Sequence, residues 1–178
     1  VPRPREWTWL ESHWDAARLG PGRSGLLVGE PGIGKSRLAM EFGAAAGREG
    51  ARSLTVFCSR AHSLSPLQPF GAVMGTVPTT PGAVVTWLGS RAGSMPVLLV
   101  VDDAQWADPS TLEVVEHVGR SGLAALVVLT ARPDAVDRLA GQIPEEQRMV
   151  VERLGPEDGR AIVRDILGPS AADGEAVD

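Results

Sequence analysis

The chain has 178 residues, 43% of them hydrophobic and 22% charged, which is enough for one compact domain with a substantial core. Its net charge is −5, and acids and arginines are interspersed without a basic block, which argues against nucleic-acid contact from this segment. There is one cysteine, no signal-peptide pattern, and no apolar run near the roughly 18 residues that a membrane span needs. We therefore expect a cytoplasmic protein without membrane contact. Because the chain begins at Val1 and ends in a small, polar tail, we also expect a piece of a longer protein.

The first third of the chain predicts alternating helices and strands. Trp7, Leu10, Trp14 and Ala17 are spaced by three or four residues, which predicts an amphipathic helix that ends near Gly20. The apolar and polar patterns that follow predict a strand, a helix and a second strand, at residues 25–29, 35–47 and 53–59.

The middle of the chain is interrupted by prolines at positions 66, 69, 78 and 81, which predict a loop with a short helix over residues 65–82. A further helix is expected at 83–93. The apolar segment 96–103 predicts a central parallel strand buried on both faces. Asp108 is expected to cap a helix that has Pro109 in its first position.

Two more strands are predicted at residues 123–130 and 148–154, the second with the weaker pattern, and residues 155–168 predict a helix of a following segment. Strands that alternate with helices imply parallel pairing through right-handed crossovers. The fold class is therefore α/β, with a mainly parallel five-stranded sheet and helices on both faces.

Residues 29–36, GEPGIGKS, fit the phosphate-binding pattern G-x-x-x-x-G-K-[ST] between a predicted strand and a predicted helix. The chain has 16 arginines but a single lysine, Lys35, which stands at the lysine position of this pattern. Its compact ammonium suits a point contact with terminal phosphates, and the Ser36 hydroxyl suits Mg²⁺. Taken alone, the pattern also fits a glycine turn that caps a helix. The predicted ATP-binding residues are Gly29, Glu30, Pro31, Gly32, Ile33, Gly34, Lys35, Ser36 and Arg37.

The run VLLVVDD at residues 97–103 describes a Walker B strand. Asp102 would hold Mg²⁺ through water, and Asp103 would orient or deprotonate the attacking water. Acids at a strand end also serve as turn formers, so the interpretation depends on the phosphate-binding pattern before it. The predicted metal-binding residues are Ser36 and Asp102.

A third signal is VLTARPD, in which Thr130 and Arg132 are expected just beyond the fourth strand. The carboxyl ends of parallel strands share one sheet edge, so these residues should lie near Asp102. Arg132 is then a candidate contact to the terminal phosphate and, with Lys35 and Asp103, a predicted catalytic residue. The alternative is a surface arginine before a proline turn. The histidines, at positions 13, 62 and 117, show no metal-ligand spacing.

GEPGIGKSRL, VVDDAQWADPSTLEVV and VLTARPD together resemble the ATP-binding domain of STAND-class P-loop ATPases. The resemblance is greatest to large LuxR-type transcriptional regulators, whose domain is often described as AAA-type. It covers residues 1–154 and implies a P-loop NTPase three-layer sandwich, with residues 155–178 as the start of a helical lid. Two departures stand out: Pro2 and Pro4 replace residues common near the adenine, which argues against an adenine contact through Arg3, and Asp103 replaces a more typical Glu.

The resemblance implies a regulatory switch that binds ATP and Mg²⁺, hydrolyses ATP slowly to ADP and self-associates in its ATP form. Sensor and effector domains in the same longer chain would be its partners. Two alternatives stay open: a P-loop kinase that phosphorylates a small molecule, and a nucleotide-binding module without hydrolysis. The paired acids and the DDAQWADPSTL run favour the switch over the kinase.

Overall fold

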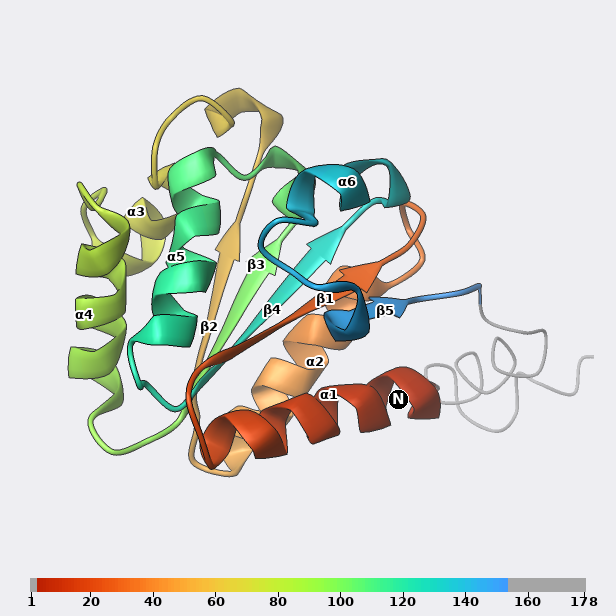
Figure 1. Ribbon diagram of the computed structural model, residues 1–178, viewed down its shortest axis with the longest axis horizontal. Helices are drawn as coiled ribbons and strands as arrows, with labels where there is room; N and C mark the ends of the chain where they lie inside the picture. The colour runs from red at the N-terminus through yellow and green to blue at the C-terminus, as the bar shows by residue number, and fades with distance from the viewer. Residues whose placement is uncertain (1–2, 154–178) are drawn as a thin grey trace, which may run out of the picture.

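The computed structural model describes residues 3–153, which form a parallel five-stranded sheet between two layers of helices (Figure 1). The spatial order of the strands is β2-β3-β4-β1-β5, and every neighbouring pair is parallel. The predicted α/β fold is confirmed. The strands are β1 (Arg23–Val28), β2 (Arg52–Phe57), β3 (Val97–Asp102), β4 (Ala125–Ala131) and β5 (Arg148–Val150).

The helices divide between the two faces of the sheet. In Figure 1, α5 lies in front of the sheet and α2 lies behind it. Two separate clusters of buried side chains follow this division, one with α1 and α2 and one with α3, α4 and α5. The helices are α1 (Pro4–Arg18), α2 (Lys35–Arg48), α3 (Gln68–Met74), α4 (Pro81–Ala92), α5 (Pro109–Arg120) and α6 (Val136–Leu139).

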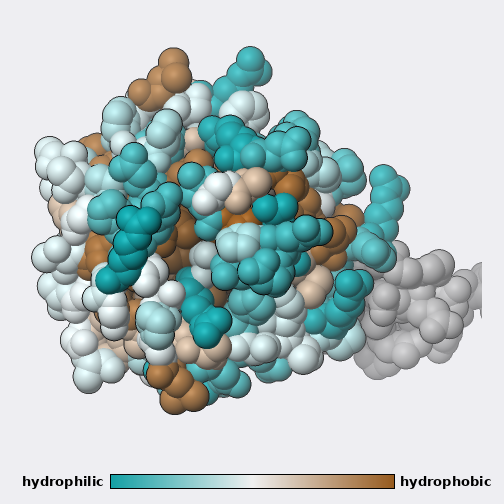
Figure 2. All heavy atoms as spheres, in the orientation of Figure 1, coloured by the Kyte–Doolittle hydropathy of each residue, from teal (hydrophilic) through white to brown (hydrophobic). Residues whose placement is uncertain are grey.

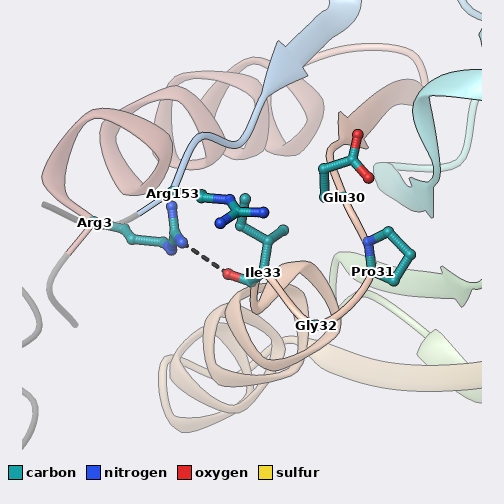
Figure 3. Close-up of a pocket in the computed structure, with 6 residues that line it drawn as sticks. All are labelled: Arg3, Glu30, Pro31, Gly32, Ile33 and Arg153. Carbon is teal, nitrogen blue, oxygen red and sulfur yellow. Dashed lines mark hydrogen bonds between the residues drawn. The ribbon is translucent and has the colours of Figure 1, made fainter.

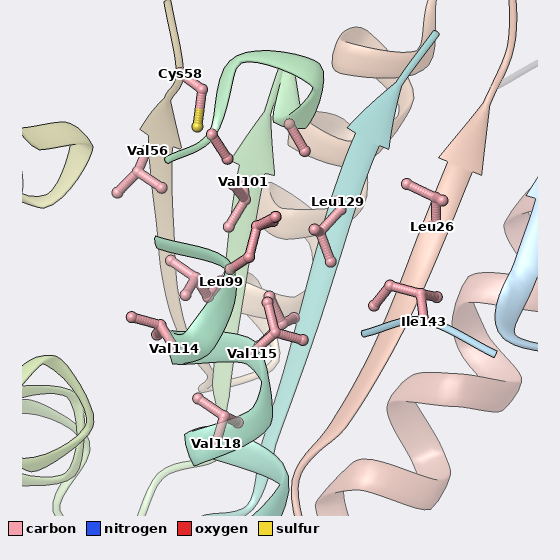
Figure 4. Close-up of a cluster of buried hydrophobic side chains, with 14 of the residues drawn as sticks. Leu26, Val56, Cys58, Leu99, Val101, Val114, Val115, Val118, Leu129 and Ile143 are labelled. Carbon is pink, nitrogen blue, oxygen red and sulfur yellow. The ribbon is translucent and has the colours of Figure 1, made fainter. Parts of the chain in front are cut away.

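Side-chain alternation along the central strands fills both clusters. In β1, Leu26 and Val28 belong to the cluster beneath α5, whereas Leu27 belongs to the cluster beneath α1 and α2. Figure 4 shows Leu26 and Leu129 on the sheet face that Val115 of α5 approaches. Because both faces are covered, a central strand has no polar face, which explains the continuous apolar run predicted for β3.

Helix α1 begins at Pro4 and ends at Arg18, so the predicted N-terminal helix is confirmed with small shifts of its ends. Proline suits the first turn because its missing N–H has no partner there. The indole of Trp9 packs against β1, where a Cβ atom added to Gly25 would lie 2.6 Å from the ring. Gly25 therefore lets the helix approach the strand closely.

Two sequence predictions need correction. The fourth strand, predicted over residues 123–130, begins at Ala125 and extends to Ala131, so Thr130 lies inside β4 and not at or beyond its end. Strand β2 ends at Phe57, so Cys58 is buried directly after the strand, where its N–H donates to Asp102 O at 3.0 Å. Burial raises the pKa of the Cys58 thiol to about 12. The helix predicted for residues 155–168 lies outside the described residues.

The surface shown in Figure 2 mixes hydrophilic and neutral residues with scattered hydrophobic ones. Isolated exposed hydrophobic side chains are normal on folded proteins and need no special explanation. Among residues 3–153, no helix has both the length and the apolar character needed to cross a membrane. The large hydrophobic residues that are exposed are Leu19, Phe57, Leu64, Val77, Met95 and Val150.

Asp108 joins two segments that are far apart in the sequence. Its carboxylate accepts hydrogen bonds from the N–H and the hydroxyl of Thr111, which confirms the predicted cap of α5. The same carboxylate accepts from the N–H of Leu67 at 3.2 Å, just before α3. Leu67 has a left-handed backbone (φ 57°), an uncommon conformation for a leucine, and its side chain is buried. Asp108 thus anchors the start of α3 to the start of α5.

Replacing Asp108 by alanine should lower the free energy of unfolding by about 2 to 3 kcal/mol, because a helix cap is lost and buried N–H groups are left unpaired. Urea denaturation followed by circular dichroism measures the change. Asp137→Ala, at an exposed position of α6, is the matched control and should change stability by no more than about 0.5 kcal/mol. Equal effects of the two substitutions would show that Asp108 does not anchor these segments.

Candidate functional site

The strand order places the candidate residues at one edge of the sheet. Strand β4 lies between β1, which leads into the glycine-rich loop of residues 29–36, and β3, which ends at Asp102. The loop is tied to β4 by a hydrogen bond from Gly29 N–H to Ala131 O at 3.2 Å. The carboxyl ends of β1, β3 and β4 therefore meet around the glycine-rich loop, as expected for a ligand site in an open parallel sheet.

The backbone of the glycine-rich loop requires glycine at three positions. Gly32 and Gly34 have positive φ angles of 76° and 97°, and a Cβ atom at either would point into open space. A Cβ atom at Gly29 would lie 2.7 Å from Val151 O. Helix α2 follows at Lys35, and its N-cap residue is Gly34, which has no side chain to cap the first turn. The positive end of the α2 dipole therefore faces the glycine-rich loop, where it favours an anion.

Lys35 is buried at the start of α2, with only 7% of its surface exposed. Its ammonium donates hydrogen bonds to the carbonyl oxygens of Gly29 (2.8 Å) and Glu30 (3.0 Å). Burial lowers the pKa of Lys35 from its ordinary value, whereas the nearby carboxylates of Asp103 and Asp102 act in the opposite direction. The ammonium is thus held inside the curve of the loop, within electrostatic reach of both acids.

A cavity of about 400 Å³, here called the loop cavity, opens beside Lys35. Its lining combines three cationic side chains, a hydroxyl and the glycine backbone with a single carboxylate. This combination suits a polyphosphate, because cations and free N–H groups are the usual partners of phosphate oxygens. The lining residues are Pro31, Gly32, Gly34, Lys35, Ser36, Arg37, Asp103 and Arg132.

Asp102 lies behind the loop cavity and does not line it. Its carboxylate is buried, and Oδ1 accepts a hydrogen bond from the Thr130 hydroxyl at 2.6 Å. The Thr130 oxygen in turn accepts from the N–H of Asp103 at 3.0 Å. One fully buried hydroxyl on β4 therefore fixes both acids at the end of β3. The sequence pattern suggested proximity but contained no signal for this bridge.

Asp103 is held in a left-handed backbone conformation, with φ 54° and ψ 45°. Aspartate tolerates this conformation better than most residues. Its carboxylate Oδ1 accepts a hydrogen bond from the Gln105 side-chain amide at 2.8 Å. Gln105 was not among the predicted site residues.

A second cavity of about 270 Å³, here called the outer cavity, also borders the glycine-rich loop (Figure 3). The guanidinium of Arg3 donates to Ile33 O at 2.7 Å and to Glu152 O at 2.9 Å, and it forms a buried ion pair with Glu6. Arg3 thus binds the loop to both ends of the described chain. The outer cavity is lined by Arg3, Glu30, Pro31, Gly32, Ile33 and Arg153.

Most of the predicted loop residues line one of the two cavities, and Pro31 and Gly32 line both. Gly29 lines neither cavity. Sequence reasoning treated Arg3 only as a doubtful adenine contact, and its buried bonds to distant carbonyls could not be read from local spacing. Among the described residues, no three His, Cys, Asp or Glu side chains form a cluster that could hold a metal ion by themselves. His13, His62 and His117 line neither cavity.

No family model matches the chain, and neither does any curated protein. Solved structures do match. AMPPCP-bound DnaA from Aquifex aeolicus has a TM-score of 0.56 at 16% identity, covering 94% of this chain and 51% of DnaA. Trip13 from Rhizobiales has a TM-score of 0.55 at 20% identity, covering 98% of this chain and 64% of Trip13. PCH-2 from C. elegans has a TM-score of 0.57 at 14% identity, covering 97% of this chain and 48% of PCH-2.

The chain therefore shares the α/β fold of these three proteins. At these identities the similarity concerns the fold alone. The chain spans less than two thirds of the length of each of these three proteins. The location of the candidate site rests on this chain's own geometry, because the glycine-rich loop and the paired acids meet at one edge of the sheet.

Thr130→Val keeps the shape of the side chain but removes both of its hydrogen bonds. We expect it to lower the free energy of unfolding by about 1 to 3 kcal/mol, because the Asp103 N–H and the Asp102 carboxylate lose their partner. Thr86→Val, at an exposed position of α4, is the control and should have little effect. Urea denaturation of both variants measures the difference, and equal stabilities would mean that the hydroxyl does not fix the two acids.

Proposed function

We propose that this domain binds ATP with Mg²⁺ and hydrolyses it slowly, as the regulatory switch of a larger signalling or transcriptional regulator. The observation that carries the proposal is the loop cavity, where Lys35, Ser36, Asp103 and Arg132 surround a glycine-lined space at the start of α2. The DnaA neighbour holds AMPPCP, an analogue of ATP, in the same fold.

The loop cavity would take the phosphates. The N–H groups at the start of α2 would surround them, and the Lys35 ammonium would exchange its contacts with Gly29 O and Glu30 O for phosphate oxygens. Ser36 and Asp102 would hold Mg²⁺, Asp102 through water. When bound, Mg²⁺ neutralises charge on the phosphates and makes the terminal phosphorus easier to attack.

The outer cavity would take the base and ribose, because it shares Pro31 and Gly32 with the loop cavity and so adjoins it along the same loop. Arg3 would shape this cavity instead of binding the base, since its guanidinium is already engaged with Glu6, Ile33 and Glu152. Arg153, which follows β5 in the chain, also lines the outer cavity and adds a positive charge there.

Hydrolysis would depend on Asp103, which lines the loop cavity and carries the carboxylate that orients or deprotonates water. Aspartate is one methylene shorter than glutamate and reaches less far toward a water at the terminal phosphate, so slow turnover is expected. Arg132, from the end of β4, would contact the terminal phosphate and distinguish ATP from ADP.

The proposed switch role is based on the sequence resemblance. It involves residues 155–178 and further domains of a longer chain in addition to the described residues. Residues 155–178 would begin a lid whose closure excludes water and completes the site. A katanin structure that concerns katanin self-assembly is similar to this chain, with a TM-score of 0.54 at 14% identity over 84% of this chain and 47% of the katanin chain. We propose that ATP favours self-association here, and that sensor and effector domains in the same chain respond to this state.

Lys35→Ala should weaken ATP binding at least tenfold, equivalent to about 1.5 to 3 kcal/mol for a charge-assisted contact, without unfolding the domain. Lys35→Arg should also impair binding, because a planar guanidinium does not fit the space of the ammonium. Calorimetry measures the affinities, with Arg120→Ala on the far end of α5 as a charge-matched control. Wild-type affinity in Lys35→Ala would refute the site.

Asp103→Asn should retain ATP affinity but slow phosphate release, because the side chain keeps its size and loses its basicity. Asp102→Asn should mainly reduce the Mg²⁺-dependent part of binding. Phosphate release is measured with and without small-molecule acceptors. Transfer to an acceptor would support the kinase alternative, whereas ATP binding without any phosphate release would support a binding module.

A further inference from the structure

The amide of Gln105 makes the only side-chain hydrogen bond recorded for the Asp103 carboxylate among the described residues. The donor is Nε2, and the distance to Asp103 Oδ1 is 2.8 Å. The opposite orientation of the amide would place its oxygen against a carboxylate oxygen, which is electrostatically unfavourable. The chemistry of the two groups therefore determines that the N–H points toward Asp103.

The backbone of Asp103 is already fixed on both sides. Its N–H donates to the Thr130 hydroxyl at 3.0 Å, and its carbonyl accepts from Trp106 N–H at 2.9 Å. These two bonds leave the Asp103 side chain able to rotate. The Gln105 amide restricts that rotation, because it holds one of the two carboxylate oxygens.

Gln105 is itself held by a residue from another element. Arg138 of α6 donates through one guanidinium nitrogen to the carbonyls of Ala104 (2.9 Å), Gln105 (3.0 Å) and Ala107 (3.0 Å). These carbonyls belong to the short 3₁₀ turn Ala104–Trp106 and the residue after it. The turn that carries Gln105 is thereby fixed to the segment that follows β4.

The other end of the amide makes no such contact. Gln105 Oε1 is buried and has no hydrogen-bond partner among the described residues. Burying an unpaired amide oxygen costs free energy, so packing alone does not favour a glutamine here. The bond to Asp103 is the interaction that the amide provides.

We infer that Gln105 is a positioning residue for hydrolysis, which holds the Asp103 carboxylate in place at the loop cavity, with Arg138 fixing the turn behind it. This inference rests on the proposed ATPase function. A carboxylate that is held in the reactive orientation needs no reorganisation before water attacks. A carboxylate that rotates freely has this orientation in only a fraction of the molecules, which lowers the rate. Gln105 touches neither water nor phosphate in this role and acts through Asp103.

The test uses Gln105→Met in the full-length protein, because methionine keeps the length and volume of glutamine but has no N–H to donate. We expect kcat for ATP hydrolysis to fall about tenfold to a hundredfold, with ATP affinity within about threefold of wild type. Gln147→Met is the matched control. Gln147 lies at the opposite end of β1, where it accepts a hydrogen bond from Ser24, and its substitution should leave hydrolysis unchanged.

A double variant separates positioning from a general structural effect. If Gln105 acts through Asp103, adding Gln105→Met to Asp103→Asn should change kcat by less than about twofold, because the group to be positioned is already disabled. Arg138→Lys should retain most of the hydrolysis, since an ammonium can still donate to the three carbonyls, and Arg138→Met should not. A fully additive double variant would overturn the inference.

The outcomes distinguish this inference from the proposed function. Wild-type protein that hydrolyses ATP, together with a normal kcat in Gln105→Met, would overturn the inference alone. Wild-type protein that binds no ATP would overturn the proposed function and the inference with it. A Gln105→Met variant whose ATP affinity falls as much as its kcat would point to a binding role and would also contradict positioning.

Discussion

The placement of the two acids depends on the buried hydroxyl of Thr130. It donates to Asp102 and accepts from the N–H of Asp103, so a single side chain on β4 joins the end of β3 to its neighbour strand. The hydroxyl can do this because β4 lies between the strand that leads into the glycine-rich loop and the strand that ends in the two acids. A hydroxyl is the smallest group that donates and accepts at once, and no water is needed to complete the bridge.

The loop side of the site is organised by burial and backbone conformation. Positive φ angles at Gly32 and Gly34 curve the chain around Lys35, and the buried ammonium meets two carbonyls of its own loop. Arg3 then ties the outer side of the same loop to residues at both ends of the described chain. Arg3 therefore couples the position of the glycine-rich loop to that of the segment directly after β5.

The DDAQWADPSTL run has a different role at each end. Asp103 lines the loop cavity and is held by Gln105, whereas Asp102 is buried beside it. At the other end, Asp108 anchors the distant segment at Leu67 to the start of α5. Arg138 fixes the backbone between these ends. The run is thus a continuous structural link from the loop cavity to the helical layer, which explains why so many polar residues lie within it near the core.

Local sequence was sufficient for the α/β class, the approximate limits of the strands and helices, the glycine-rich loop around Lys35, and the cap at Asp108. Each depends on periodicity, backbone preference or a side chain that bonds within a few residues of itself. Only the tertiary structure decided the order of the strands, the bridge at Thr130 and the bonds of Arg3. It also decided the hydrogen bond between Gln105 and Asp103 and the contact of Arg138 with the turn that carries Gln105. Strand order follows from pairings between distant segments, and a polar side chain finds its buried partner only after those segments have come together.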